Sequence, residues 1–218
     1  AVLTLNAATV AKALQKYEAA QQRGGVLYVQ RPPTALAQEL AVVEQQVDKT
    51  RSWQAQLGWD ETHLYLRFGV VGPSRLVNSM QDPTLIFKGG NLMDVQLATN
   101  ANANSKRTKP APGDVRLLVS RRPDGKAVAV LLRPKVAGFN GEPIVLKSPT
   151  GTESFDSIKE IEGVSIKVGP LYEKKGRKKV KVKNAFLAVA KVPLKALGWK
   201  PVSGQTIRAD IGYIFGNA

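Results

Sequence analysis

A group of polar side chains separates two apolar stretches of the sequence, within residues 78–94. Four of these side chains carry oxygen atoms that can bind a hard cation: Asn78, Asp82, Asn91 and Asp94. Calcium takes about six to eight such oxygens, so a calcium site is one interpretation. No EF-hand spacing accompanies the four residues, and Asn and Asp side chains also cap turns. The sequence leaves both interpretations open, and the polar group is the first place to look for a ligand.

Residues suited to covalent or zinc-assisted catalysis are scarce in this chain. It contains no cysteine and one histidine, His63. This composition excludes disulfides and thiolate metal sites, and it leaves zinc without its usual ligands. A serine nucleophile would need His63 as its base, and no Gly-x-Ser-x-Gly motif is present. We therefore expect that the protein is not an enzyme.

The strongest charge feature is the segment 174–183, KKGRKKVKVK, in a chain with a formal net charge of +15. Its seven basic residues are Lys174, Lys175, Arg177, Lys178, Lys179, Lys181 and Lys183. Gly176 can turn the chain, which predicts a hairpin whose lysines protect a sheet edge from aggregation. The same charges can contact phosphate, sulfate or carboxylate groups of an acidic polymer. Since Tyr172 is the lone neighbouring aromatic residue, we favour edge protection with nonspecific polyanion affinity over a nucleic-acid site.

The segments that position these residues mainly show the alternating apolar and polar pattern of β-strands. Apolar and polar residues alternate in His63–Val71 and Leu92–Ala98, which is typical of strands with one buried face. Further strands are predicted over residues 115–121, 126–133, 163–168, 180–192 and 206–215. Pro123-Asp124-Gly125 predicts an antiparallel hairpin. Short strands without long helices between them predict an all-β fold, an antiparallel β-sandwich.

The N-terminal residues have a different pattern. Residues 6–25 repeat apolar side chains at helical spacing, and a second helical pattern runs from Thr34 to Val47. We predict one or two N-terminal helices within an extension of residues 1–47, packed on a sandwich domain of residues 48–218. No stretch approaches 18 apolar residues and no signal-peptide pattern begins at Ala1, so we expect a soluble chain with no membrane span.

Several short motifs follow one another in a set order between residues 48 and 218. They are Trp59-Asp60 before His63-Leu64-Tyr65-Leu66, Leu76-Val77-Asn78 with Asp82, Leu85–Asn91 leading into Met93–Leu97, Gly113–Leu118, Val189–Leu194 with Leu197-Gly198, and Gly204 with Ile207–Gly212. This order resembles the family 9 carbohydrate-binding modules and the DOMON-like sandwich domains. Two features depart from that pattern: Asn91 stands where an acidic residue is common, and the sequence ends where a final strand is expected.

The resemblance implies a noncatalytic carbohydrate-binding or adhesion module of a secreted or cell-surface bacterial protein, of planctomycete type. In such modules aromatic rings stack on sugars while polar side chains bond the hydroxyl groups. The implied stacking residues are Trp53, Trp59 and Tyr65, and the implied polar partners are Arg67, Asn78, Asp94, Gln96 and Arg116. For each tryptophan, packing in the core or at a strand edge is the favoured interpretation.

The resemblance also leaves two other functions open. Some DOMON-like domains bind haem, and here His63, Met80, Met93 and Lys88 could act as axial ligands of a noncovalent haem. Alternatively, the protein is a structural or assembly subunit without sugar binding, either a homo-oligomer or one domain of a larger protein. The expected partners are therefore a carbohydrate or cell-surface polymer and, at the basic segment, an acidic polymer.

Overall fold

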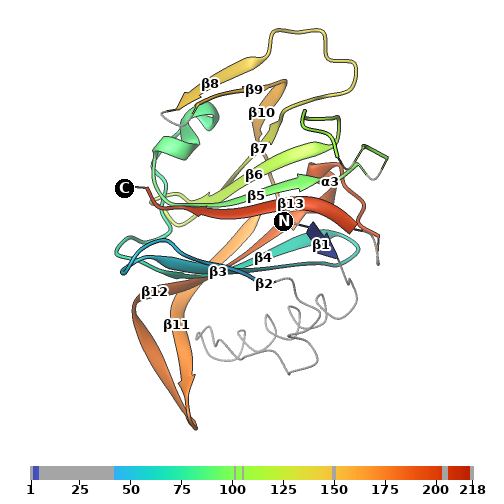
Figure 1. Ribbon diagram of the computed structural model, residues 1–218. Helices are drawn as coiled ribbons and strands as arrows, with labels where there is room; N and C mark the ends of the chain where they lie inside the picture. The colour runs from blue at the N-terminus through green and yellow to red at the C-terminus, as the bar shows by residue number, and fades with distance from the viewer. Residues whose placement is uncertain are drawn as a thin grey trace.

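The computed structural model describes residues 2–4, 42–100, 102–104, 106–148, 151–202 and 206–216, which form two packed antiparallel sheets (Figure 1). In spatial order the six-stranded sheet contains β1 (Val2–Thr4), β13 (Thr206–Ile214), β5 (Leu92–Ala98), β6 (Asp114–Arg121), β7 (Ala127–Arg133) and β10 (Ser157–Glu160). The five-stranded sheet contains β11 (Ser165–Lys175), β12 (Lys178–Pro193), β4 (His63–Val71), β3 (Ser52–Trp59) and β2 (Val42–Gln46). The prediction of an antiparallel β-sandwich is confirmed.

Three smaller elements complete the described structure. Strands β8 (Ile144–Ser148) and β9 (Gly151–Phe155) form a separate two-stranded sheet, which lies beside the outer face of the six-stranded sheet (Figure 1). A 3-10 helix, η1 (Pro83–Lys88), precedes β5, and the single-turn helix α3 (Leu194–Leu197) follows β12. Gly198 ends α3 in the left-handed conformation, at φ 63°, which is common for glycine at this position.

The core lies between the two sheets and follows from the alternation of apolar residues. In β4, Leu64, Leu66, Phe68 and Val70 are at most 1% exposed and belong to this core. The matching side chains of β5 are Met93, Val95 and Leu97, so the intervening residues of β5 point away from the core. A second apolar cluster, on the other side of the six-stranded sheet, packs β6 and β7 against η1, β9 and β10.

The hairpin and strand predictions agree with the structure. β4 and β5 have the predicted bounds, and β6 pairs antiparallel with β7 across the predicted turn. The strands predicted over residues 180–192 and 206–215 correspond to β12 and β13, whereas the strand predicted over residues 163–168 covers only the first part of β11, which continues to Lys175. β4 and β5 lie in different sheets, so the polar segment between them crosses from one sheet to the other.

The prediction of a second N-terminal helix is wrong over residues 42–46, which form β2. This segment pairs antiparallel with β3, from Val42 opposite Gln56 to Gln46 opposite Ser52. The strand is favoured because β3 offers a free edge of backbone hydrogen-bonding groups, and such tertiary pairing overrides a short helical pattern. The first predicted helix, residues 6–25, lies outside the described residues. No helix among the described residues is long and apolar enough to cross a membrane.

Candidate ligand-binding groove

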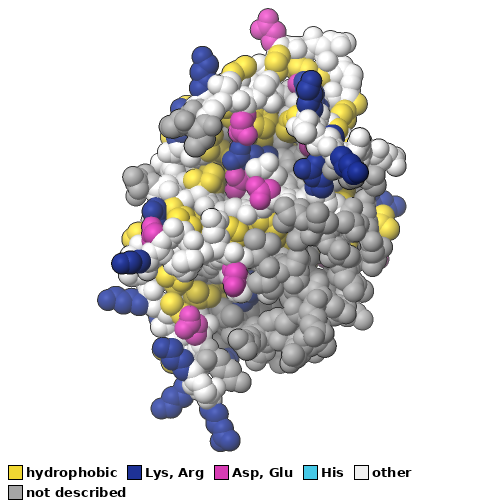
Figure 2. All heavy atoms as spheres, in the orientation of Figure 1, with side chains coloured by type: hydrophobic (Ala, Val, Ile, Leu, Met, Phe, Trp, Pro, Cys, Tyr) yellow, Lys and Arg dark blue, Asp and Glu magenta, His cyan; other side chains and the backbone are white. Residues whose placement is uncertain are grey.

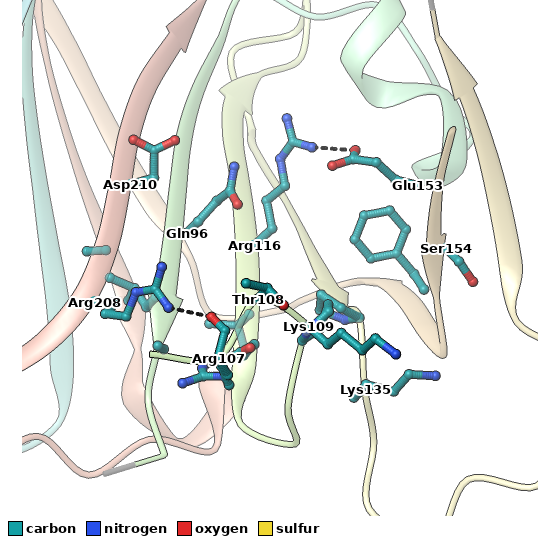
Figure 3. A pocket seen from close by; sticks show the side chains of 18 of the residues that line it. Gln96, Arg107, Thr108, Lys109, Arg116, Lys135, Glu153, Ser154, Arg208 and Asp210 are labelled. Carbon is teal, nitrogen blue, oxygen red and sulfur yellow. Dashed lines mark hydrogen bonds and ion pairs between the residues drawn. The ribbon is translucent and has the colours of Figure 1, made fainter. Parts of the chain in front are cut away.

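The described residues form an open groove of about 680 Å³ on the outer face of the six-stranded sheet. Its floor consists of β13, β5 and β6. One wall is the β9 segment Thr152–Phe155 together with Pro134 and Lys135, and the other includes the loop residues 107–110 (Figure 3). This volume lies in the range of small-ligand sites. The β-sandwich therefore has a concave surface on the outer face of its six-stranded sheet.

A row of polar side chains crosses the floor of the groove. Asp210 of β13 is the cross-strand partner of Gln96 in β5, and Gln96 is the partner of Arg116 in β6. Cross-strand partners share a face of a sheet, so the three side chains lie side by side, as Figure 3 shows. They offer a carboxylate, an amide and a guanidinium within one row. This arrangement can donate and accept hydrogen bonds along an extended polar ligand.

Arg116 joins the floor of the groove to its wall. Its Nε and Nη2 donate to Asp94, with the shortest distance 2.6 Å from Nη2 to Oδ2, and its Nη1 donates to Glu153 Oε2 at 2.9 Å. Burial raises the pKa of the Asp94 carboxyl, and Arg116 partly offsets this effect. Burial alone would lower the pKa of Arg116, but the bond to Asp94 raises it instead. The guanidinium therefore stays charged and fixes both carboxylates.

Two other basic side chains at the groove are also paired with carboxylates. Arg107 donates to Asp114, and its carbonyl accepts from Arg208 Nη1 at 2.9 Å. Lys135 Nζ lies 3.3 Å from Asp156 Oδ1. Each of these two basic side chains thus has a carboxylate partner close by. Three basic side chains of the groove, Arg107, Arg116 and Lys135, are thus paired with carboxylates, which favours a polar ligand that leaves these pairs intact.

The aromatic residues predicted to stack on a sugar do not reach the groove. Trp53 and Trp59 are each 4% exposed and lie in the core between the sheets. Tyr65 is buried, and its hydroxyl donates to Asp60 Oδ2 at 2.6 Å. None of the three rings has an open face on which a sugar could stack. The two tryptophans are packed in the core, and Tyr65 is held beside the β3–β4 turn by its bond to Asp60. Phe155 is the aromatic side chain among the described residues that line the groove, and it is 3% exposed.

The polar residues predicted as sugar partners divide into two groups. Asp94 bonds Arg116, and Gln96 and Arg116 line the groove, so the structure brings these three together. Arg67 is buried, and its Nη1 donates to Gln56 Oε1 at 2.6 Å. Asn78 is fully buried in the segment before β5. Arg67 and Asn78 are therefore parts of the structural framework and not of the groove.

The polar crossing predicted as a calcium site is held together by its own hydrogen bonds. Asn78 Oδ1 accepts from Met80 N at 3.0 Å and Asn91 Oδ1 accepts from Gly216 N at 2.8 Å. Asp82 Oδ1 accepts from Thr84 N at 2.8 Å and caps η1. Together with Asp94, which bonds Arg116, all four proposed ligands use their oxygens for N–H donors. Among the described residues no group of three or more acidic or histidine side chains is placed to hold a metal ion.

The residues considered for haem are also dispersed. Met93 is fully buried between the sheets, whereas Lys88 is exposed. His63 lies at the start of β4, where its Nδ1 is 2.7 Å from Thr62 Oγ1. These positions do not define one ligand pocket. The seven basic residues of 174–183 lie elsewhere again, on the β11–β12 hairpin.

Sequence reasoning missed most of the residues that line the groove, among them Asp210 and Glu153. Asp210 alternates with Ala209 and Ile211, which are buried, and this alternation marks it as outward-facing. Glu153 had no local signal, because it reaches the groove through an ion pair with a residue 37 positions away. A long-range pair of this kind cannot be read from the spacing of residues.

The fold and groove define an antiparallel β-sandwich with a polar groove on the outer face of one sheet. Comparisons of this chain with family models, with curated proteins and with solved structures found no match. The structure therefore supports one part of the family resemblance, the sandwich architecture.

Proposed function

We propose that the protein is a noncatalytic carbohydrate-binding module of an extracellular or cell-surface protein, and that the saccharide lies in the groove on the six-stranded sheet. The observation that carries this proposal is the row Asp210–Gln96–Arg116 on the floor of the groove. Carboxylate, amide and guanidinium groups are the side chains that bond sugar hydroxyls. We also propose that the sandwich is related to the family 9 carbohydrate-binding modules, since the order of its motifs supports that relation.

The charge balance of the groove favours a neutral saccharide. Arg116, Arg107 and Lys135 each lie against a carboxylate. If a charged ligand broke such a pair, the carboxylate would be left desolvated without its cation, which is unfavourable. Gln96 is exposed and offers both a donor and an acceptor, which a hydroxyl can satisfy without breaking a pair. With Phe155 buried, hydrogen bonding contributes more to binding here than aromatic stacking.

A glycan array followed by calorimetry on the best neutral oligosaccharide tests this proposal. Gln96→Ala should weaken binding about tenfold, because one side chain that bonds hydroxyls is lost. Gln54→Ala is the matched control, since Gln54 is exposed on β3 of the other sheet. The proposal fails if no neutral saccharide binds at millimolar concentration, or if both substitutions weaken binding equally.

A second candidate is a structural or assembly subunit without sugar binding. The burial of Trp53 and Trp59 favours it, because these rings are the usual stacking groups of a sugar site and here they serve the core. Light scattering after size exclusion distinguishes the two candidates when it is combined with the array. A stable multimer that binds no saccharide supports the assembly subunit, whereas saccharide binding by a monomer supports the binding module.

A further inference from the structure

The β11–β12 hairpin extends beyond the sandwich as a separate arm. β12 pairs with β4 only from Ala185 to Pro193, so the residues before Ala185 have β11 as their one strand neighbour in the described structure. Four backbone pairs continue the hairpin, from Tyr172 opposite Lys181 to Lys175 opposite Lys178. Gly176 turns the tip at φ 60°. Figure 1 shows this arm, residues 172–183, projecting away from both sheets.

The root of the arm is fixed to the sandwich. The pairing register shifts between Pro170 and Tyr172, which marks a bulge that redirects the strand. On the opposite strand Asn184 has φ 52°, and its carbonyl accepts from Gly72 N at 2.8 Å. Leu171 packs against the buried Leu187 of β12. These contacts give the arm a defined direction away from the protein surface.

Positive charge is concentrated on this arm. Lys175, Arg177 and Lys178 are exposed at its tip, and Lys181 and Lys183 are exposed along β12. Glu173 is the acidic residue of segment 172–183. Lys175 lies directly opposite Lys178, a pairing of like charges that disfavours the hairpin. Figure 2 shows the basic side chains gathered at the end of the molecule where the hairpin terminates.

We propose that the arm is a second binding site, independent of the groove, and that it binds an acidic polysaccharide. Alternate residues of one strand face lie about 6.5–7 Å apart, so Lys179, Lys181 and Lys183 form a straight row of cationic side chains on β12. A row of this kind matches an extended chain that bears sulfate or carboxylate groups at intervals. Segment 172–183 has no Asn or Gln to read adenine, and six of its seven basic residues are Lys, which act as point charges without a fixed bidentate geometry. With Tyr172 its one aromatic residue, it also lacks a platform for stacking bases.

The test compares two triple variants that remove the same charge. Lys179, Lys181 and Lys183 are changed to Gln in the arm variant, and Lys49, Lys159 and Lys200, which are exposed elsewhere, are changed to Gln in the control. The probes are heparin, polygalacturonate and random-sequence duplex DNA, each titrated at several salt concentrations. The arm variant should lose about tenfold or more in affinity for heparin and reduce the salt slope by about 2–3, because it releases fewer counterions. The control should lose less than about threefold.

The wild-type protein should bind heparin or polygalacturonate more tightly than duplex DNA at equal salt. An equal loss in both triple variants would overturn the proposal, since it would trace binding to the net charge of the whole protein. Tighter binding of duplex DNA would overturn it in favour of a nucleic-acid site. Unchanged thermal unfolding of the arm variant would show that its loss of heparin affinity does not come from a loss of folding. Unchanged binding of a neutral saccharide by the same variant would show that the groove is unaffected.

Discussion

Two buried tyrosines differ in whether their hydroxyl groups have a hydrogen-bond partner. Tyr65 donates its hydroxyl to Asp60 at 2.6 Å, whereas the hydroxyl of Tyr213 has no hydrogen-bond partner among the described residues. Tyr213 packs among aromatic rings, with the ring of Phe215 centred 4.7 Å away. Burial raises the pKa of the Tyr213 hydroxyl well above its usual range. The Tyr213 ring therefore contributes to packing while its hydroxyl has an uncompensated desolvation cost.

Replacing Tyr213 by Phe should stabilise the protein. Removal of the unpartnered hydroxyl should raise the free energy of unfolding by about 1 kcal/mol, and Tyr65→Phe should lower it by about 2 kcal/mol because a bond to a carboxylate is lost. Urea unfolding of the two variants and the wild type measures both changes. Loss of stability in both variants would contradict the assignment of Tyr213 as unpartnered.

Asp60 makes the β3–β4 turn sensitive to acid. Burial alone would raise its pKa, but bonds from the Tyr65 hydroxyl, Thr62 N and His63 N lower it to about 2 from 3.8. A carboxyl group whose pKa is lower in the folded state than in the unfolded state stabilises the fold at pH values above the unfolded-state pKa. This stabilisation is lost as the pH falls through the folded-state pKa. The wild type should lose about 2 kcal/mol between pH 4 and pH 2 from this group. In Asp60→Asn this component should be absent, so chemical unfolding at pH 5 and pH 2 should show the two proteins converging in acid.

At the level of residues, alternation predicted which side chains share a face but not which face has the ligand. Asp94 and Gln96 were expected to be binding residues, and they lie on the outer face with Arg116. Trp53 and Trp59 share their side of β3 with Ala55 and Leu57, a pattern that equally describes a core face. Aromatic rings suit cores and sugar sites alike, so residue type could not distinguish the two.

Among the elements, the crossing before β5 depends on glycine at one position. Gly90 has φ 145°, and a Cβ there would lie 2.1 Å from the carbonyl oxygen of Val77. It also forms an isolated bridge with Asn78, whose amide donates to Ile86 O and so ties η1 to the sheet. The crossing is thus a packed structural unit, and its polar residues are used to hold η1 in place.

Gly90→Ala should therefore be strongly destabilising. The contact with the Val77 carbonyl cannot be relieved without moving backbone, so we expect a loss of about 2–4 kcal/mol. Gly212→Ala is the control, because a Cβ at Gly212 meets no atom within 4 Å. Thermal unfolding of the two variants measures the difference. A loss in Gly212→Ala as large as that in Gly90→Ala would contradict this role of the crossing.

Strands with clear alternation were predictable from sequence, and elements that depend on distant partners were not. β4 and β5 have the predicted bounds because their apolar residues recur at every second position. β2 escaped prediction because its conformation is set by pairing with β3. β8 and β9 have few buried side chains, so burial left little periodic signal in their sequences. Phe155, which packs in the second apolar cluster, and the Glu153–Arg116 ion pair together hold β9 as a groove wall.

In the whole molecule the two proposed sites belong to different sheets and differ in charge. The groove lies on the six-stranded sheet and three of its basic side chains are paired with carboxylates, whereas the arm extends from the five-stranded sheet and its charges are exposed. Exposed charge contacts are screened by salt, and hydrogen bonds to neutral hydroxyls are much less affected. The two sites should therefore respond differently to ionic strength.

Raising salt from about 0.05 to about 0.5 M should weaken heparin binding about a hundredfold or more, given at least three ionic contacts. Binding of a neutral oligosaccharide should change by less than about twofold over the same range. Calorimetry at each salt concentration provides both measurements. Parallel losses of the two ligands would show that the neutral saccharide also binds through exposed charges, contrary to its assignment to the groove.

A saccharide that lies over the Asp210–Gln96–Arg116 row should shift the amide resonances of the groove, and chemical-shift mapping detects such shifts residue by residue. The labelled wild-type protein is titrated with the tightest neutral oligosaccharide from the array. We predict that the largest shifts fall on Gln96, Arg116, Glu153 and Asp210, which line the groove, and that residues 172–183 do not respond. An absence of shifts at millimolar ligand, or shifts centred outside the groove, would show that the groove is not the saccharide site.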